Sequence, residues 1–158
     1  MKKNTETVLA LISGAGIGAL MTRKLLNKSA NGQDKKVDKF KSYYNMLNQW
    51  LVLKQEGKSL TEYFVNNNIN TIAIYGMGEM GNRLYDELKN SGIKVKYAID
   101  KNAESTYSEL DIRTLKDELP FVDAIIVTAV FAFDDIEKEI SSNVEYKVIS
   151  LEDVVYEI

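Results

Sequence analysis

The sequence predicts an α/β fold built on a single parallel sheet of about five strands, in the order 3-2-1-4-5. Three observations support this prediction. An apolar strand, residues 72–75, runs directly into glycines spaced Gly-x-Gly-x-x-Gly, which open an amphipathic helix. A second apolar strand follows and ends on an acidic residue, Asp100. Residues 123–128 form a near-continuous apolar run, the pattern of a strand buried on both faces of a parallel sheet.

The composition limits the chemistry that this chain can perform. With 158 residues, it can hold one domain with a real core and an appendage, but hardly two full domains. It contains no cysteine and no histidine, which excludes disulfides, zinc–thiolate sites and Ser-His-Asp or Cys-His catalysis. Residues 1–41 carry nine basic against three acidic side chains, whereas residues 42–158 carry eleven against twenty. An acidic body argues against nucleic acid as a partner.

The first element, residues 1–28, is predicted to be an apolar helix. Val8 to Met21 are uncharged, and as a helix they would span about 21 Å, short of the roughly 30 Å hydrocarbon core. A short membrane anchor or interfacial helix is the favoured interpretation, while a signal peptide and a soluble segment stay open. Seven basic residues between Arg23 and Lys41 place the following part on the cytoplasmic face of the cell membrane. Residues 29–36 read as a solvated linker.

Residues 37–68 are predicted to form a helical hairpin. Apolar residues at helical spacing indicate a first helix that ends near Gly57: Val37, Phe40, Tyr44, Leu47 and Leu51, with Tyr43 and Trp50 widening the stripe. Ser59 and Glu62 have the spacing of a capping box for a second short helix. The simplest interpretation of the stripe is packing on the sheet domain. The alternative is a partner-binding or dimer-forming face.

Residues 69–158 are predicted to form the sheet domain. After the glycine turn, its helix and the strand ending at Asp100, a weak strand is expected near Leu110 to Arg113. The strand at 123–128 is followed by a helix over 133–140, a last strand over 147–151 and a short terminal helix or tail. With right-handed crossovers these elements give a Rossmann-like nucleotide-binding domain, and the chain holds no separate substrate domain.

The glycine turn nominates a nucleotide site. Gly76 permits the tight turn, Gly78 lets the backbone approach a pyrophosphate, and Gly81 lets the helix lie close to the strand. Asp100 is placed to accept hydrogen bonds from a ribose diol and would repel a 2′-phosphate, so NAD is favoured over NADP, a preference that Lys101 weakens. The complete set of predicted binding residues is Gly76, Met77, Gly78, Glu79, Met80, Gly81, Asp100, Lys101, Thr128 and Ala129.

Other residues weaken the nucleotide site or have the spacing of a catalytic site. Glu79, in the first helical turn, would oppose an incoming diphosphate unless Arg83 pairs with it, so a scaffold that keeps the turn but binds no dinucleotide stays open. Tyr85 and Lys89 have the Tyr-x-x-x-Lys spacing of short-chain dehydrogenases but lie on the wrong helix. We therefore predict no catalytic residue and no metal site.

Six segments together resemble a family of Rossmann-like modules in bacterial capsule and exopolysaccharide proteins, loosely described as nucleoside-diphosphate-sugar epimerase-like. They are YYNMLNQWL (43–51), EGKSLTEYF (56–64), IAIYGMGEMGNRLYDELKNSGI (72–93), YAIDKNA (97–103), DAIIVTA (123–129) and ISLEDV (149–154). The resemblance implies a role in surface-polysaccharide synthesis, with a glycosyltransferase or another protein of that process as partner. The glycine turn and Asp100 match the family, whereas the catalytic Tyr-x-x-x-Lys pair is absent from the matching position.

The sequence thus predicts a module that binds NAD(H) or a nucleotide-sugar and has an accessory or regulatory role in polysaccharide synthesis, with membrane association through its N-terminal segment. Two alternatives stay open. One is a small NAD-dependent oxidoreductase or sugar-nucleotide-modifying enzyme completed by a partner. The other is an interaction scaffold that binds no ligand.

Overall fold

The computed structural model describes residues 36–105, 108–142 and 146–158 of the chain. The described residues belong to two units, which divide between Lys41 and Ser42. The predicted apolar helix over 1–28 and the linker over 29–36, apart from Lys36, lie outside the described residues. Within the described part, no helix has both the length and the apolar character needed to cross a membrane.

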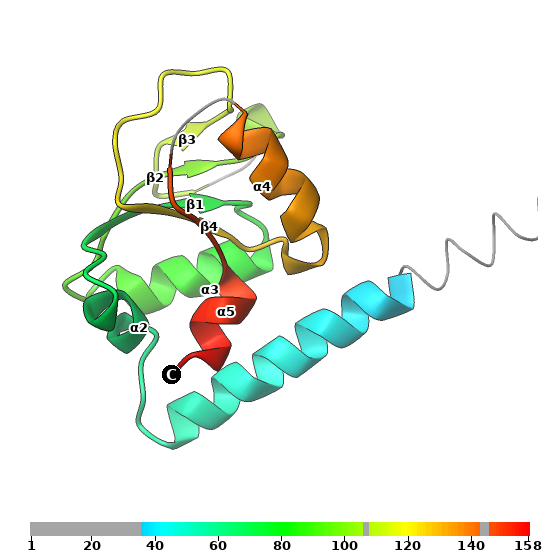
Figure 1. The fold of residues 1–158 in the computed structure, drawn as a ribbon, viewed down its shortest axis with the longest axis vertical. Coiled ribbons are helices and arrows are strands. Elements are labelled where there is room, and N and C mark those ends of the chain that lie inside the picture. The colour runs from blue at the N-terminus through cyan, green and yellow to red at the C-terminus, as the bar shows by residue number, and fades with distance from the viewer. Residues whose placement is uncertain (1–35, 106–107, 143–145) are drawn as a thin grey trace, which may run out of the picture. The chain divides into compact units, whose positions relative to one another are not determined.

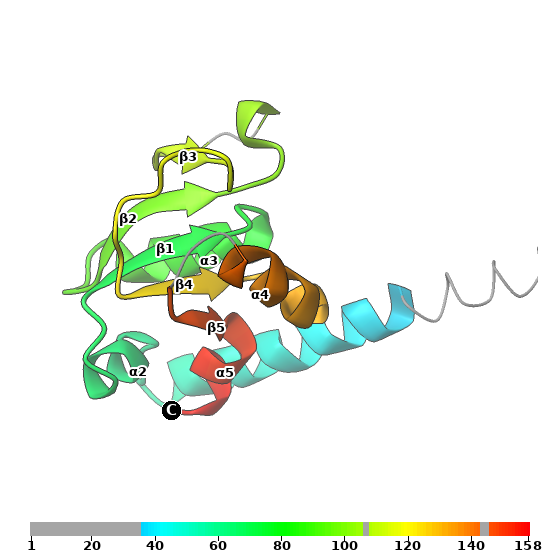
Figure 2. The ribbon, with the colours of Figure 1, turned by 45° about the horizontal axis from the view of Figure 1, so that its top comes forward.

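The second unit contains a five-stranded parallel sheet in the order β3-β2-β1-β4-β5. The α/β class, the five parallel strands and their order are therefore confirmed (Figures 1 and 2). The strands are β1 (Thr71–Tyr75), β2 (Lys94–Ile99), β3 (Ile112–Arg113), β4 (Ala124–Val127) and β5 (Val148–Ser150). The central strand β1 is almost entirely buried, as expected for a parallel sheet covered on both faces.

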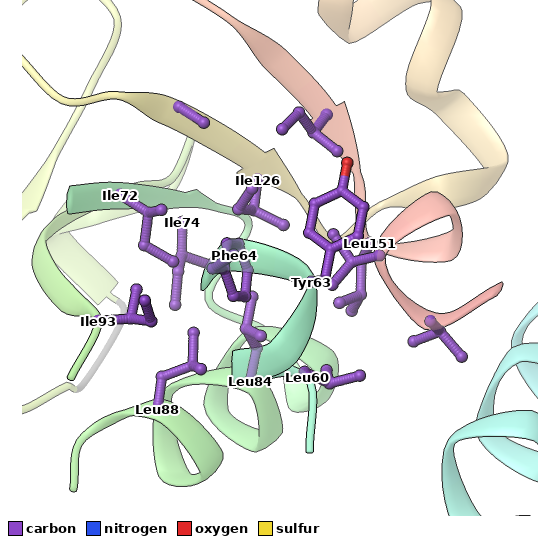
Figure 3. Packing of buried hydrophobic residues seen from close by; sticks show 14 of the residues in the cluster. Leu60, Tyr63, Phe64, Ile72, Ile74, Leu84, Leu88, Ile93, Ile126 and Leu151 are labelled. Atoms are coloured by element: carbon purple, nitrogen blue, oxygen red, sulfur yellow. The ribbon is translucent and has the colours of Figure 1, made fainter. Parts of the chain in front are cut away.

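Alternate residues of each strand point to opposite faces of the sheet, and helices cover both faces. On one face, Ile72 and Ile74 of β1 lie in a core with residues of α2 (Thr61–Asn66), α3 (Glu79–Leu88) and α5 (Leu151–Tyr156), shown in Figure 3. On the other face, Ala73 and Tyr75 lie in a core with residues of α4 (Phe133–Ser141). Two single turns complete the elements, η1 (Ala103–Ser105) and η2 (Val130–Ala132).

Residues 36–55 form one helix, which we call the 36–55 helix. It ends at a turn in which Gly57 has a φ of 75°, a conformation that favours glycine. In α2, the Glu62 carboxylate accepts a hydrogen bond from the Ser59 backbone N–H at 3.2 Å, which is one half of the predicted capping box. Asn68, with a φ of 56°, turns the chain into β1.

The face by which the 36–55 helix contacts the sheet domain differs from the favoured prediction. Met46, Trp50 and Leu53 are buried in the core with α2 and α3, and Tyr43 packs against the same cluster. Of the stripe predicted to pack there, Tyr43 and Trp50 do so, whereas the other five residues are exposed: Val37, Phe40, Tyr44, Leu47 and Leu51. Both stripes are apolar, so hydrophobicity does not decide between them. The inner stripe packs on the sheet domain because it brings the Trp50 indole N–H within 2.7 Å of the Glu87 carboxylate on α3.

Candidate nucleotide site

The turn after β1 requires glycine at two of its three glycine positions. Gly76 has a φ of 93°, where side chains are strained, and a Cβ there would lie 2.8 Å from the Thr128 hydroxyl oxygen. At Gly81, a Cβ would lie 2.2 Å from the carbonyl oxygen of Gly76, a contact between backbone and side chain that cannot relax cheaply. These two glycines are explained by the close approach of α3 to the turn.

Gly78 has no such explanation inside the fold. Its backbone is extended, with φ −71° and ψ −162°, which any residue adopts, and a Cβ there would meet nothing within 4 Å. Gly78 is the N-cap of α3, where no side chain caps the helix. The space in front of the first amides of α3 is therefore open to an anion, which the helix dipole attracts.

Asp100 joins the end of β2 to the glycine turn. One carboxylate oxygen accepts a hydrogen bond from the Met77 backbone N–H at 2.9 Å, and the other accepts one from the Asn102 N–H at 2.9 Å. A carboxylate has about four lone-pair directions, so two remain after these bonds. Asp100 is thus fixed beside the glycine turn with acceptor capacity to spare.

Thr128, at the end of β4, supports the turn from the other side. Its hydroxyl donates a hydrogen bond to the Gly76 carbonyl at 2.7 Å, and its backbone N–H donates to the Tyr75 carbonyl at 3.0 Å. The side chain is 4% exposed and faces the backbone of the turn. In the structure, Thr128 therefore contacts the backbone of the turn and maintains the shape of the site.

Two pockets lie at the carboxyl ends of the central strands. One, of about 430 Å³, is lined by Gly76, Asp100, Ala129, Phe131 and Ile136, among others. The second, of about 410 Å³, lies toward β3 and is lined by Ile99, Thr114 and Leu115, among others. Tyr75, Asp100, Lys101 and Glu139 line both pockets. The first pocket lies at the crevice where the strand order reverses between β1 and β4, the usual ligand site of open α/β sheets.

An ion pair lies at the boundary that the two pockets share. The Lys101 ammonium, just after β2, lies 2.8 Å from a carboxylate oxygen of Glu139 on α4. Both side chains are substantially exposed, so the pair contributes little to stability and can part at small cost. In the structure the Lys101 ammonium is directed at Glu139.

Tyr75 places a buried hydroxyl against this ion pair. Its side chain is 4% exposed, and its hydroxyl has no partner with hydrogen-bond geometry in the described part of the chain. Burial raises the pKa of the hydroxyl above 10.0, Glu139 raises it further, and the nearby Lys101 ammonium lowers it in part. The hydroxyl therefore stays protonated at neutral pH and can donate a hydrogen bond.

Most of the predicted binding residues lie together at the glycine turn and the pockets beside it. The side chains of Met77 and Met80 belong to the core, and the Met77 backbone N–H donates to Asp100. Glu79 is exposed in the first turn of α3 and makes no ion pair with Arg83 in the described structure, so its charge opposes an incoming diphosphate. Ala129 lines the larger pocket.

The Tyr85–Lys89 pair lies elsewhere, beside a separate pocket of about 280 Å³ near Ser91 and Gly92. The Tyr85 hydroxyl donates to a Glu109 carboxylate oxygen at 3.4 Å. Among the described residues, no group of acidic side chains is arranged to hold a metal ion.

Sequence reasoning missed two residues of the crevice. Tyr75 was predicted only as part of a strand, although a tyrosine that ends an otherwise aliphatic strand next to the glycine turn is a usable signal. Glu139 carried no local signal, since its partner Lys101 is 38 positions away.

The chain was compared with protein-family models, curated proteins and solved structures, and none of them matches it.

Proposed function

We propose that this protein is a nucleotide-binding module whose ligand is NAD(H) or a nucleotide-sugar. The observation that supports this most directly is Gly78. The fold requires glycine at Gly76 and Gly81, but at Gly78 neither the backbone conformation nor the packing does. A phosphate that approaches the amides of α3 supplies the missing reason, because a side chain there would block it.

The surrounding groups fit the remaining parts of such a ligand. Asp100 would accept hydrogen bonds from the ribose hydroxyls, through the lone pairs that Met77 and Asn102 leave free. The 430 Å³ pocket beside Ala129 and Phe131 offers apolar walls for a base. Since Asp100 is a carboxylate, a 2′-phosphate would be repelled and NAD should bind better than NADP, although Lys101 weakens this preference whenever it parts from Glu139.

The proposed role is binding or regulation rather than self-sufficient catalysis. The crevice is lined by one tyrosine, two lysines and carboxylates, without the histidine or cysteine that serve most often as general base or nucleophile. The resemblance to capsule and exopolysaccharide modules supports a role in surface-polysaccharide synthesis, beside a glycosyltransferase or a similar partner. The basic, apolar N-terminal sequence supports attachment to the cytoplasmic face of the membrane.

The test is ligand binding by the full chain and by a variant changed only at Gly78. Thermal-shift and calorimetric titrations with NAD, NADP and UDP-glucose come first, since a ligand at 100 times its Kd adds about 2.7 kcal/mol of stability. In Gly78→Thr, the new side chain fills open space, and threonine caps helices about as well as glycine. We expect unchanged unliganded stability and loss of binding.

Gly92→Thr is the matched control, because Gly92 also meets nothing within 4 Å and lies outside the crevice. It should bind ligand as the unmodified chain does. If none of the three nucleotides stabilises the unmodified chain, or if Gly78→Thr binds normally, the proposal is wrong.

A further inference from the structure

The second pocket, of about 410 Å³, has no role in the proposed binding of a nucleotide. That proposal assigns the phosphate to the start of α3, the ribose to Asp100 and the base to the 430 Å³ pocket. The second pocket shares Asp100 with the first and lies toward β3, where Thr114 and Lys116 line it. A group attached to a ribose hydroxyl at Asp100 would therefore enter the second pocket.

The second pocket has hydrogen-bond donors that the protein leaves unused. Lys101 and Lys116 bring ammonium groups to it, and Lys116 makes no ion pair within the described residues. The buried Tyr75 hydroxyl lies near the Lys101 ammonium and has no hydrogen-bond partner in the described part of the chain. Buried polar groups without a partner are rare in folded proteins, so this hydroxyl points to an acceptor that a ligand supplies.

Glu139 supplies the anion that Lys101 binds in the structure. Its carboxylate comes from α4 and lies 2.8 Å from the Lys101 ammonium. The side chains of Lys101 and Glu139 are 64% and 43% exposed, so the pair contributes little to stability. Its effect on the charge of the pocket is larger. The two lysines of the second pocket balance its two carboxylates, Asp100 and Glu139, and without Glu139 positive charge would be in excess.

The residues beside the ribose position do not by themselves decide between NAD and NADP. Asp100 repels a 2′-phosphate, whereas Lys101, the following residue, attracts it. These two charges oppose each other in their effect on the phosphate unless one of them is engaged elsewhere. In the structure Lys101 is engaged by Glu139, so the repulsion from Asp100 prevails.

We propose that Glu139 is the residue that excludes a ribose 2′-phosphate from this crevice, by occupying the Lys101 ammonium. With Glu139 in place, a phosphate in the second pocket meets two carboxylates, and Lys116 alone offers it an unpaired ammonium. Without Glu139, it is bound by Lys101 and Lys116, and the Tyr75 hydroxyl can donate to it. The second pocket is thus a phosphate subsite that the protein's own carboxylate closes. This inference rests on the proposed function, because it places the ribose at Asp100.

Calorimetric titration with NAD and NADP tests the inference in the unmodified chain and in Glu139→Gln. Glutamine keeps the size of the side chain and its helix propensity but carries no charge. We expect the ratio of the NADP Kd to the NAD Kd to fall roughly tenfold, because the 2′-phosphate gains a charge-assisted bond to Lys101. Adding Lys101→Met to Glu139→Gln should return the ratio to about that of the unmodified chain.

Glu137→Gln is the matched control. Glu137 lies on the same helix, lines neither pocket and makes no ion pair among the described residues. Its substitution removes the same charge from α4 without releasing Lys101, so the ratio should stay that of the unmodified chain. A fall as large as that in Glu139→Gln would assign the preference to the net charge of α4 and would overturn the proposal.

The remaining outcomes separate this inference from the proposed function. If NAD binds and Glu139→Gln leaves the ratio unchanged, the inference is wrong and the nucleotide site stands. If the ratio stays low after Lys101→Met is added, Glu139 acts by its own repulsion and not through Lys101, which also overturns the inference. If UDP-glucose binds but neither NAD nor NADP does, the proposed function stands without this inference. If no nucleotide binds, both are wrong.

Discussion

Glu87→Ala removes a buried carboxylate that joins α3 to two other helices. Glu87 lies on α3 with its side chain 7% exposed. One carboxylate oxygen accepts from the Trp50 indole N–H at 2.7 Å, and the other accepts from the Leu60 backbone N–H at 2.8 Å and pairs with the Lys54 ammonium. This carboxylate therefore holds the 36–55 helix and the start of α2 against the sheet domain.

The magnitude follows from what the substitution leaves behind. Trp50 is 6% exposed and Leu60 is fully buried, so both N–H groups would lose their partner without gaining water. Each unsatisfied buried donor costs about 1–3 kcal/mol. The pair with Lys54, whose side chain is 43% exposed, adds about 0–1 kcal/mol. We expect Glu87→Ala to lower the free energy of unfolding by about 2–7 kcal/mol, a large part of a typical domain's 5–15 kcal/mol.

Urea unfolding followed by circular dichroism measures this difference. Asp86→Ala is the control, because Asp86 is the neighbouring residue on α3 and makes only an exposed pair with Lys89. Its unfolding midpoint should match that of the unmodified chain. Glu87→Gln keeps one acceptor oxygen and should lie between the two. An unchanged midpoint in Glu87→Ala would refute the view that this carboxylate holds the two helices.

Two further predictions concern the crevice and the response to acid. Tyr75→Phe removes a buried hydroxyl that has no hydrogen-bond partner in the described structure, so unliganded stability should not fall, whereas calorimetry should show NAD affinity weakened by about 3- to 10-fold. Equal affinity would place the hydroxyl outside the ligand site. The backbone N–H groups of Asn70 and Thr71 lower the pKa of Asp123 in the folded state. Because this folded pKa is depressed, the carboxylate adds stability at neutral pH that is lost as pH falls below about 4, and thermal melts of Asp123→Asn should show a shallower loss over that range. An equally steep loss would exclude Asp123 as a source of the acid response.

The fold was predictable from sequence where its determinants are local. The unit from β1 to β2 has a strand, a glycine turn and an amphipathic helix within thirty residues, and each is specified by its own residues. The strand β3 is only two residues long, Ile112–Arg113, and its short apolar pattern gave just an approximate position. The parallel order followed from the handedness of crossovers rather than from any single residue.

The packing face of the 36–55 helix was not predictable in this way. Periodicity shows that a helix has an apolar stripe, but this helix has two, and hydrophobicity alone does not rank them. The choice depends on the bond from Trp50 to Glu87, which are 37 positions apart. The residues of the candidate site also fall into a predictable and an unpredictable group. Gly76, Gly81 and Asp100 follow from a motif, whereas the Lys101–Glu139 pair exists only once α4 lies against the sheet.

The position of Trp50 has a practical consequence for spectroscopy. It is the only tryptophan of the chain, and its indole N–H is bound by the same helix whose first residue follows Gly78. Glu87 and Gly78 lie nine residues apart, about 14 Å along α3. Intrinsic indole emission therefore observes one junction of the molecule, at the far end of the helix that begins at the glycine turn. A change in that emission on adding a nucleotide that does not absorb in its range would report a change at this junction, without any label attached to the protein.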